Sequence, residues 1–158
     1  MPPRILIVDD HEIVREGIRT LINRSRPKWE ICGEAANGSQ ALAAVESLKP
    51  DVIILDITMP GLSGIEAAQK LVKSETKTRI LMFTMHESAR LENDVREAGA
   101  HGLVLKSQAS RDLIVAIERL LAGGTFFPNP SETDTPPPGT RFGPGNLLLR
   151  ALVLNPAF

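Results

Sequence analysis

The sequence predicts an α/β fold in which five strand–helix units form a doubly wound parallel sheet. Two observations predict it. Short runs of Ile, Leu and Val alternate with longer segments in which apolar residues recur every three or four positions. The links between these segments are short, which favours parallel strands joined by right-handed helical crossovers. The 158 residues suit one domain with a core of its own and leave little for a second.

Five apolar runs predict the strands. Three of them are almost continuously Ile, Leu and Val, as expected of strands that are buried on both faces of a parallel sheet. The second run alternates more loosely and is expected at an edge. In chain order the runs are residues 4–9, 29–35, 51–56, 79–84 and 102–106.

Each run is followed by a segment whose apolar residues fall on one helical stripe. The stripes extend from Ile13 to Ile22, Leu42 to Leu48, Ile65 to Val72, Leu91 to Ala98 and Leu113 to Leu121. Turn and capping residues agree with these limits: Asn37 and Gly38 precede the second stripe, Gly99 follows the fourth and Gly123 follows the fifth. Five units are too few for a closed barrel of eight. We therefore expect an open sheet in the flavodoxin-like order 2-1-3-4-5.

Composition excludes several classes of protein. Lys and Arg total 18 against 19 for Asp and Glu, so the chain as a whole has no basic footprint for duplex DNA or anionic lipid. A single cysteine, Cys32, excludes an internal disulfide framework, and a cytoplasmic setting is expected. No apolar run approaches the roughly 20 residues that span a bilayer, so no membrane segment is expected.

The last part of the chain differs from the rest. Of 12 prolines, seven lie in residues 125–158 and five in residues 1–124. The sequence therefore predicts a folded domain over residues 1–124 and a proline-rich, mostly disordered tail over residues 125–158. A short apolar helix at residues 147–154 is the only element expected in that tail.

Polar residues follow four of the five predicted strands. In an open parallel sheet the carboxyl ends of the strands converge on one edge, where ligands bind. The residues selected by this rule are Asp9, Asp10, Asp56, Thr84 and Lys106. Taken alone, either Asp9 or Asp10 could be a helix N-cap, Thr84 a strand-end residue and Lys106 a solvated one. Three clustered carboxylates repel one another unless a hard cation neutralises them, which points to Mg²⁺.

At these positions the sequence resembles the receiver domain of two-component response regulators. The resemblance covers residues 4–122 and rests on Val8-Asp9-Asp10, on Ile54-Leu55-Asp56 with the following Ile57-Thr58-Met59-Pro60-Gly61, on Phe83-Thr84 and on Leu105-Lys106. It implies that Asp56 accepts a phosphoryl group from a histidine kinase. It also implies that Asp9, Asp10, Asp56 and the backbone carbonyl of Thr58 bind Mg²⁺, while Thr84 and Lys106 contact the phosphoryl group. Such a protein is a stoichiometric acceptor that catalyses its own phosphorylation and dephosphorylation.

Other positions are given roles by the same resemblance. Thr58 and His86 lie where residues tune self-hydrolysis, although each could be an ordinary polar loop residue. Leu103 stands where receivers usually carry an aromatic residue, often tyrosine, that couples Thr84 to the output surface. Among the remaining histidines, His11 is interpreted as a helix N-terminal residue rather than a metal ligand. His101 is expected at the surface.

The output is the open question. The opening residues 9–22 and Thr84-Met85-His86-Glu87 most resemble the branch of response regulators that carries a LuxR-type helix-turn-helix. Residues 125–158 contain no basic recognition helix, so direct DNA binding is not expected. We expect instead that the protein signals to an unknown downstream protein partner. The alternatives are a truncated DNA-binding transcriptional regulator and a haloacid-dehalogenase-type phosphatase. The phosphatase is disfavoured because its nucleophile precedes its acidic pair and because Thr58 stands where its general acid would be. A homodimer is left open.

Overall fold

The computed structural model describes residues 1–128 and confirms the predicted fold class. Five parallel strands form one sheet in the order β2-β1-β3-β4-β5, with β2 at an edge as expected. The strands are β1 (Arg4–Val8), β2 (Glu30–Ala35), β3 (Val52–Asp56), β4 (Arg79–Thr84) and β5 (Gly102–Leu105). The helices are α1 (Glu12–Ser25), α2 (Gly38–Leu48), α3 (Gly64–Lys73), α4 (Ala89–Glu97) and α5 (Ala109–Leu121), and a 3-10 turn at Lys106–Gln108 precedes α5.

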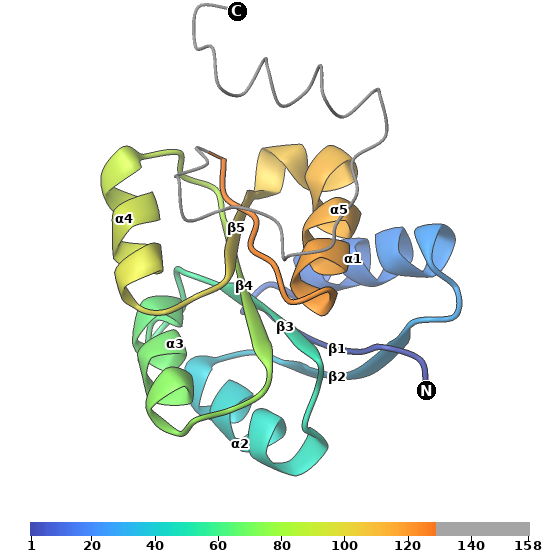
Figure 1. Cartoon of the computed structure of the whole chain (residues 1–158), viewed down its shortest axis with the longest axis horizontal. Helices are drawn as coiled ribbons and strands as arrows, with labels where there is room; N and C mark the ends of the chain where they lie inside the picture. Colours follow the sequence, from blue (N-terminus) through green and yellow to red (C-terminus); the bar gives the residue numbers. More distant parts are fainter. Residues whose placement is uncertain (129–158) are drawn as a thin grey trace, which may run out of the picture.

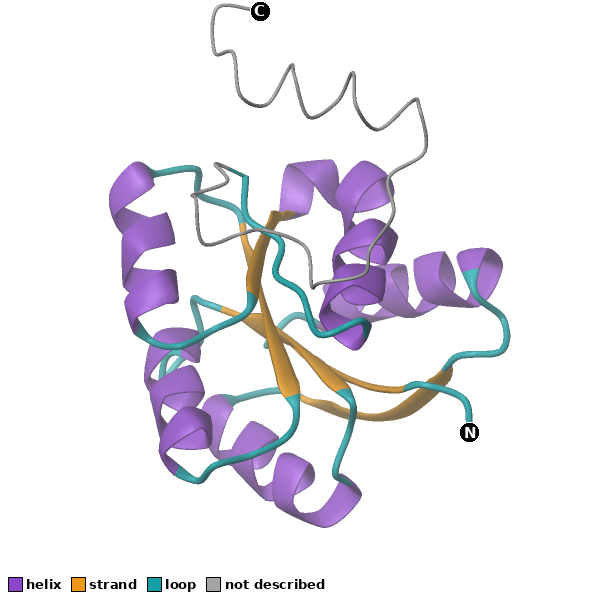
Figure 2. Cartoon of the chain, viewed as in Figure 1, coloured by secondary structure: helices purple, strands orange, loops and turns teal. Residues whose placement is uncertain are grey.

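Helices cover both faces of the sheet (Figures 1 and 2). Because successive strand residues point to opposite faces, each strand contributes to two apolar clusters. Leu6, Ile53 and Met82 belong to the cluster under α2, α3 and α4. Their strand neighbours Ile7 and Ile54 belong to the cluster under α1 and α5. This two-sided burial explains why the central strands read as nearly unbroken apolar runs.

Capping residues set the starts of three helices. The side chains of Asn37, Ser63 and Ser88 accept hydrogen bonds from backbone N–H groups in the first turns of α2, α3 and α4. At the other ends, Gly99 follows α4 with φ of 90° and Gly123 follows α5 with φ of 88°, a backbone conformation that glycine adopts without strain. The loops that follow α4 and α5 therefore begin where the sequence predicts.

The first residues of the predicted tail lie against the sheet. Phe126 forms an isolated parallel bridge with Gly102 of β5, and Phe127 is buried at 9% exposure. The rest of that tail, including the expected helix at residues 147–154, lies outside the described residues. Within residues 1–128, no helix is both long enough and apolar enough to cross a bilayer.

Candidate functional site

Three carboxylates meet at the carboxyl ends of the neighbouring strands β1 and β3. Asp9 and Asp10 follow β1, and Asp56 is the last residue of β3. One oxygen of each carboxylate and a ring nitrogen of His11 all lie within 4.8 Å of one another. Asp9 is fully buried and Asp56 is 3% exposed, so these charges have little solvent to stabilise them. The structure thus brings together the acidic residues that the sequence selects.

Lys106 provides the positive charge of this cluster. Its Nζ lies 2.9 Å from Asp9 Oδ2 and 3.3 Å from Asp56 Oδ1. Lys106 follows β5, whereas Asp9 follows β1 and Asp56 ends β3. Groups from three strands therefore meet at one edge of the sheet. Burial alone lowers the pKa of Lys106, but hydrogen bonds to Asp9 and the charges of Asp56 and Asp9 outweigh it and raise that pKa. The ammonium therefore stays charged between the two carboxylates.

The surroundings of Asp56 oppose the ionisation of its carboxyl group. Burial, together with the nearby charge of Asp9, raises the pKa of Asp56 from 3.8 to about 6. Lys106 and a hydrogen bond from the backbone N–H of Thr58 act in the opposite direction. At neutral pH the group is still mostly ionised. A buried carboxylate held in this state is available as a nucleophile.

The loop after Asp56 closes tightly around that residue. The backbone N–H of Gly64, the first residue of α3, donates to Ile57 O at 2.8 Å. A Cβ at position 64 would lie 2.1 Å from the Asp56 carbonyl oxygen, so only glycine allows this approach. Gly61 supports the same turn with φ of 76°. The Thr58 side chain is exposed in this loop.

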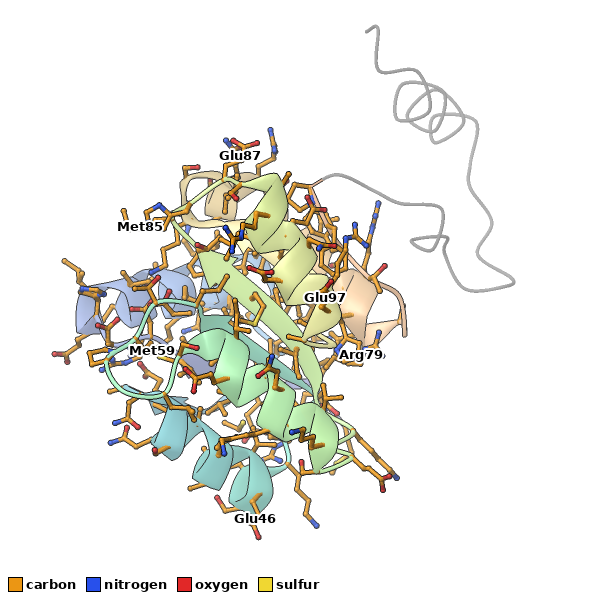
Figure 3. All side chains as sticks on the ribbon, turned by 90° about the vertical axis from the view of Figure 1, so that its left-hand side faces the viewer. Glu46, Met59, Arg79, Met85, Glu87 and Glu97 are labelled. Carbon is orange, nitrogen blue, oxygen red and sulfur yellow. The ribbon has the colours of Figure 1, made fainter. Side chains whose placement is uncertain are left out.

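Thr84 ends β4 and is buried. The sheet register pairs Asp56 with Phe83, which places Thr84 one residue further toward the carboxyl edge. Its Oγ1 accepts a hydrogen bond of 3.2 Å from the backbone N–H of His86. Figure 3 shows Met85 and Glu87 on the loop after β4, at the end of that strand opposite to Arg79. The hydroxyl of Thr84 is thus tied to the loop that leads into α4, and the His86 side chain is exposed there.

Leu103 belongs to the apolar cluster under α2, α3 and α4. It is 3% exposed, so an aliphatic core residue fills the position for which the receiver resemblance implies an aromatic one. Leu103 therefore does not come together with the acidic cluster.

Two histidines differ from the sequence-based interpretation. His11 is the N-cap of α1, as expected, but its Nδ1 also lies 3.2 Å from Asp9 Oδ1 and 3.1 Å from Asp10 Oδ1. Asp10 does not cap that helix. His101, expected at the surface, is partly buried, and its Nδ1 accepts a 2.9 Å hydrogen bond from the backbone N–H of Ile80. No periodicity signals that contact, because it joins β4 to the residue that precedes β5.

The donor set fits a hard divalent cation. Asp9 Oδ2 and Asp10 Oδ1 are buried carboxylate oxygens whose neighbours at ion-pair distance are Lys106 Nζ and His11 Nδ1. Three carboxylates face one ammonium, which leaves the cluster with an excess of negative charge. Mg²⁺ takes carboxylate oxygens and retains several waters, so it suits a partly open cluster of this kind.

Comparison with known proteins agrees with this arrangement. A family model described as the response regulator receiver domain matches residues 5–118. The nitrate/nitrite response regulator protein NarL of Escherichia coli K12 is 39% identical over 125 residues, which cover 77% of this chain and 56% of that protein. This chain therefore spans about half the length of that relative.

Solved structures give the same result. A LuxR-family two-component response regulator from Aurantimonas sp. SI85-9A1 is 42% identical with a TM-score of 0.75, covering 80% of this chain and 89% of that one. The isolated receiver domain of RcsB from Salmonella enterica serovar Typhimurium, solved with the phosphomimetic BeF3−, is 27% identical with a TM-score of 0.74. The match covers 81% of this chain and 94% of that one.

Proposed function

This chain belongs to the response regulator receiver family, and on that premise we propose that Asp56 accepts a phosphoryl group from the phosphohistidine of a sensor kinase. One observation carries the proposal: Asp56 is a buried carboxylate with Lys106 Nζ 3.3 Å away and two further carboxylates beside it. A nucleophile, a fixed positive charge and oxygens for a cation are the groups that phosphoryl transfer to a carboxylate needs.

In the proposed transfer an ionised oxygen of Asp56 attacks phosphorus. A P–O bond forms to Asp56, the P–N bond to the donor histidine breaks, and the electron pair of that bond returns to the histidine ring. The pKa of about 6 keeps Asp56 mostly ionised at neutral pH, so the side chain needs no separate general base.

The carboxylates of Asp9, Asp10 and Asp56 and the backbone carbonyl of Thr58 would hold Mg²⁺. When bound, this cation offsets the charge that builds up on the phosphoryl oxygens. Lys106 supplies a positive charge to the same oxygens, and it already contacts both Asp9 and Asp56. Its loss would leave the transferred group with less stabilisation in the protein.

Thr84 would report the modification. Its hydroxyl hydrogen-bonds a phosphoryl oxygen on Asp56, and the loop that is tied to Thr84 through His86 N–H moves with it. Thr58 and His86 flank the modified group on exposed loops, where their side chains would set how readily water reaches it. The protein so described is a stoichiometric phosphoacceptor that catalyses its own phosphorylation and dephosphorylation.

The acceptor is tested by incubating the protein with Mg²⁺ and acetyl phosphate and measuring the intact mass. We expect one added phosphoryl group on the wild type and none on Asp56→Asn. The matched control is Asp51→Asn, an exposed carboxylate just before the same strand, which should label like the wild type. Equal labelling of the wild type and Asp56→Asn would rule out Asp56 as the acceptor.

The relatives extend well beyond the part that this chain matches, so the output of the whole protein is a separate matter. We propose that the phosphorylated domain signals to a protein partner in the cytoplasm. The truncated-regulator alternative is compatible with the same receiver chemistry. The tail boundary at residue 124 and a homodimer stay predictions.

A further inference from the structure

Residues 124–127 form a docked segment along β5. Phe126 N–H donates to His101 O at 3.0 Å, and Leu103 N–H donates to Phe126 O at 2.8 Å. Arg79 Nη2 donates to Gly124 O at 2.7 Å, which holds the start of the segment. Figure 1 shows this stretch, drawn in orange after α5, running beside β5. The segment thus adds a short parallel pairing to the edge strand of the sheet.

The two phenylalanines of the segment point to opposite faces of the sheet. Phe126 packs on the cluster under α1 and α5, with the guanidinium of Arg119 from α5 5.5 Å from its ring centroid. Phe127 is buried in the cluster under α2, α3 and α4, and the guanidinium of Arg96 from α4 lies 3.8 Å from its ring centroid. Successive residues of an extended strand alternate in this way. One ring therefore contacts α5 and the other contacts α4.

Two residues of α4 establish the contact with the Phe127 ring. Glu92, one turn earlier in the helix and 7% exposed, accepts from Arg96 Nη2 at 3.1 Å and orients the guanidinium. A cation held over an aromatic face at this distance is a directional interaction. Phe127 also shares its apolar cluster with Leu103. The cluster around Leu103 therefore contains an aromatic ring, but residue 127 supplies it.

One segment of the chain, the loop after Thr84 and then α4, links Thr84 to the guanidinium over this ring. Thr84 Oγ1 accepts from His86 N–H, and two residues later the Ser88 side chain caps α4. Arg96 lies in the last turn of the same nine-residue helix. A movement of the loop at Thr84 would therefore displace α4 and, with it, the guanidinium over Phe127. Physical contiguity of this kind is required for coupling, but only a measured response demonstrates it.

We propose that the surface formed by the β5 edge and α4 is the docking site of this chain's own segment 124–127, and that Phe127 makes docking depend on the phosphorylation state. The inference rests on the proposed function, because phosphorylation of Asp56 is what would move Thr84 and α4. On this proposal, the segment that follows α5 carries the output signal of the domain. By linkage, docking of the segment and binding of a phosphoryl analogue must affect each other by the same factor.

The test is amide hydrogen exchange on the full chain, with and without Mg²⁺ and BeF3−. The amides of Phe126 and Leu103 report docking, and the amide of His86 reports the site. In the wild type we expect the analogue to change exchange at Phe126 and Leu103 at least tenfold. Phe127→Leu, which keeps an apolar side chain but removes the ring face, should reduce that response at least threefold. The matched control Phe126→Leu, on the α5 side, should retain it.

The possible results separate the two proposals. If His86 responds to the analogue while Phe126 and Leu103 do not, the docking inference is overturned and the receiver chemistry stands. If Phe126→Leu abolishes the response as strongly as Phe127→Leu, contact with α4 is not the cause and the inference is again wrong. If no amide of the wild type responds and no phosphoryl group adds to Asp56, the proposed function itself is overturned.

Discussion

Polar side chains occupy both ends of this sheet, but they find different partners. At the amino ends of the strands, three polar side chains contact a backbone group of another segment. Asp51 Oδ2 accepts from Arg4 N–H at 2.8 Å, Thr78 Oγ1 donates to Pro50 O at 2.7 Å, and His101 Nδ1 accepts from Ile80 N–H. At the carboxyl ends, Asp9, Asp56 and Lys106 contact one another.

The difference indicates which polar residues stabilise the fold and which belong to the candidate functional site. A buried side chain that completes a backbone hydrogen bond removes an unsatisfied group and stabilises the fold. Burial of a charged carboxylate and a like charge beside it do the reverse, and both raise the pKa of Asp56. In the function proposed above, a bound cation would offset this penalty.

We expect the largest effect when the positive charge is removed from the carboxyl end of the sheet. Lys106→Met leaves Asp9 and Asp56 facing each other without their ammonium, and we expect it to lower the free energy of unfolding by about 3 kcal/mol at pH 7. Urea denaturation measures the loss. In the Lys106→Met/Asp56→Asn double variant the loss should shrink, because one of the two carboxylates is gone. An equal loss in both backgrounds would show that the charge of Asp56 contributes nothing to the effect of Lys106.

A second change removes the buried charge of Asp56 itself. Asp56→Asn should raise the free energy of unfolding by about 2 kcal/mol at pH 7, because Asp56 binds its proton more tightly in the folded protein than in the unfolded chain. The folded pKa of about 6 lies above the ordinary 3.8, so the wild type loses stability as pH rises through this interval. The advantage of the variant should therefore vanish below pH 3.8. Thermal unfolding across that range measures it, and a variant less stable than the wild type at pH 7 would contradict the argument.

The amino end should respond to acid with the opposite sign. Burial and the charge of Arg79 lower the pKa of His101 from 6.5 to about 4, and protonation of Nδ1 would remove the acceptor for Ile80 N–H. The stability that neutral His101 contributes is fully present above pH 6.5 and is lost as pH falls toward 4. We expect a loss of about 1–2 kcal/mol, reduced because solvent screens part of the ring.

The His101 effect is best measured in the Asp56→Asn background, where the opposing titration is absent. Unfolding as a function of pH should then show a single loss between pH 6.5 and 4. His101→Asn, whose amide oxygen can accept the same hydrogen bond, is the matched variant and should lack this loss. A pH profile that is identical with histidine and asparagine at position 101 would disprove the assignment.

The smallest expected effect comes from Thr78→Val. The substitution keeps a β-branched side chain at a buried position and removes the hydrogen bond to Pro50 O, for a loss of about 1 kcal/mol. Phosphorylation of Asp56 by acetyl phosphate should remain at the wild-type level. A marked loss of labelling with unchanged stability would mean that the two ends of the sheet are not separable.

The sequence alone was enough to predict the fold and most of the acidic cluster. The continuous Ile, Leu and Val runs report burial on two faces, and parallel strands place their carboxyl ends together, so Asp9, Asp10, Asp56 and Lys106 follow from position. These predictions succeed because each depends on local pattern and on a general rule of topology.

Tertiary structure alone decided which atoms meet. That Lys106 lies between Asp9 and Asp56, that the His11 ring faces two carboxylates and that His101 accepts from Ile80 all depend on register and rotamers across different segments. The sequence likewise does not predict that Phe126 and Phe127 pack on opposite sides of the sheet, because it predicts a tail in this segment. Local pattern carries no information about such contacts, because their geometry is set only when distant strands pair.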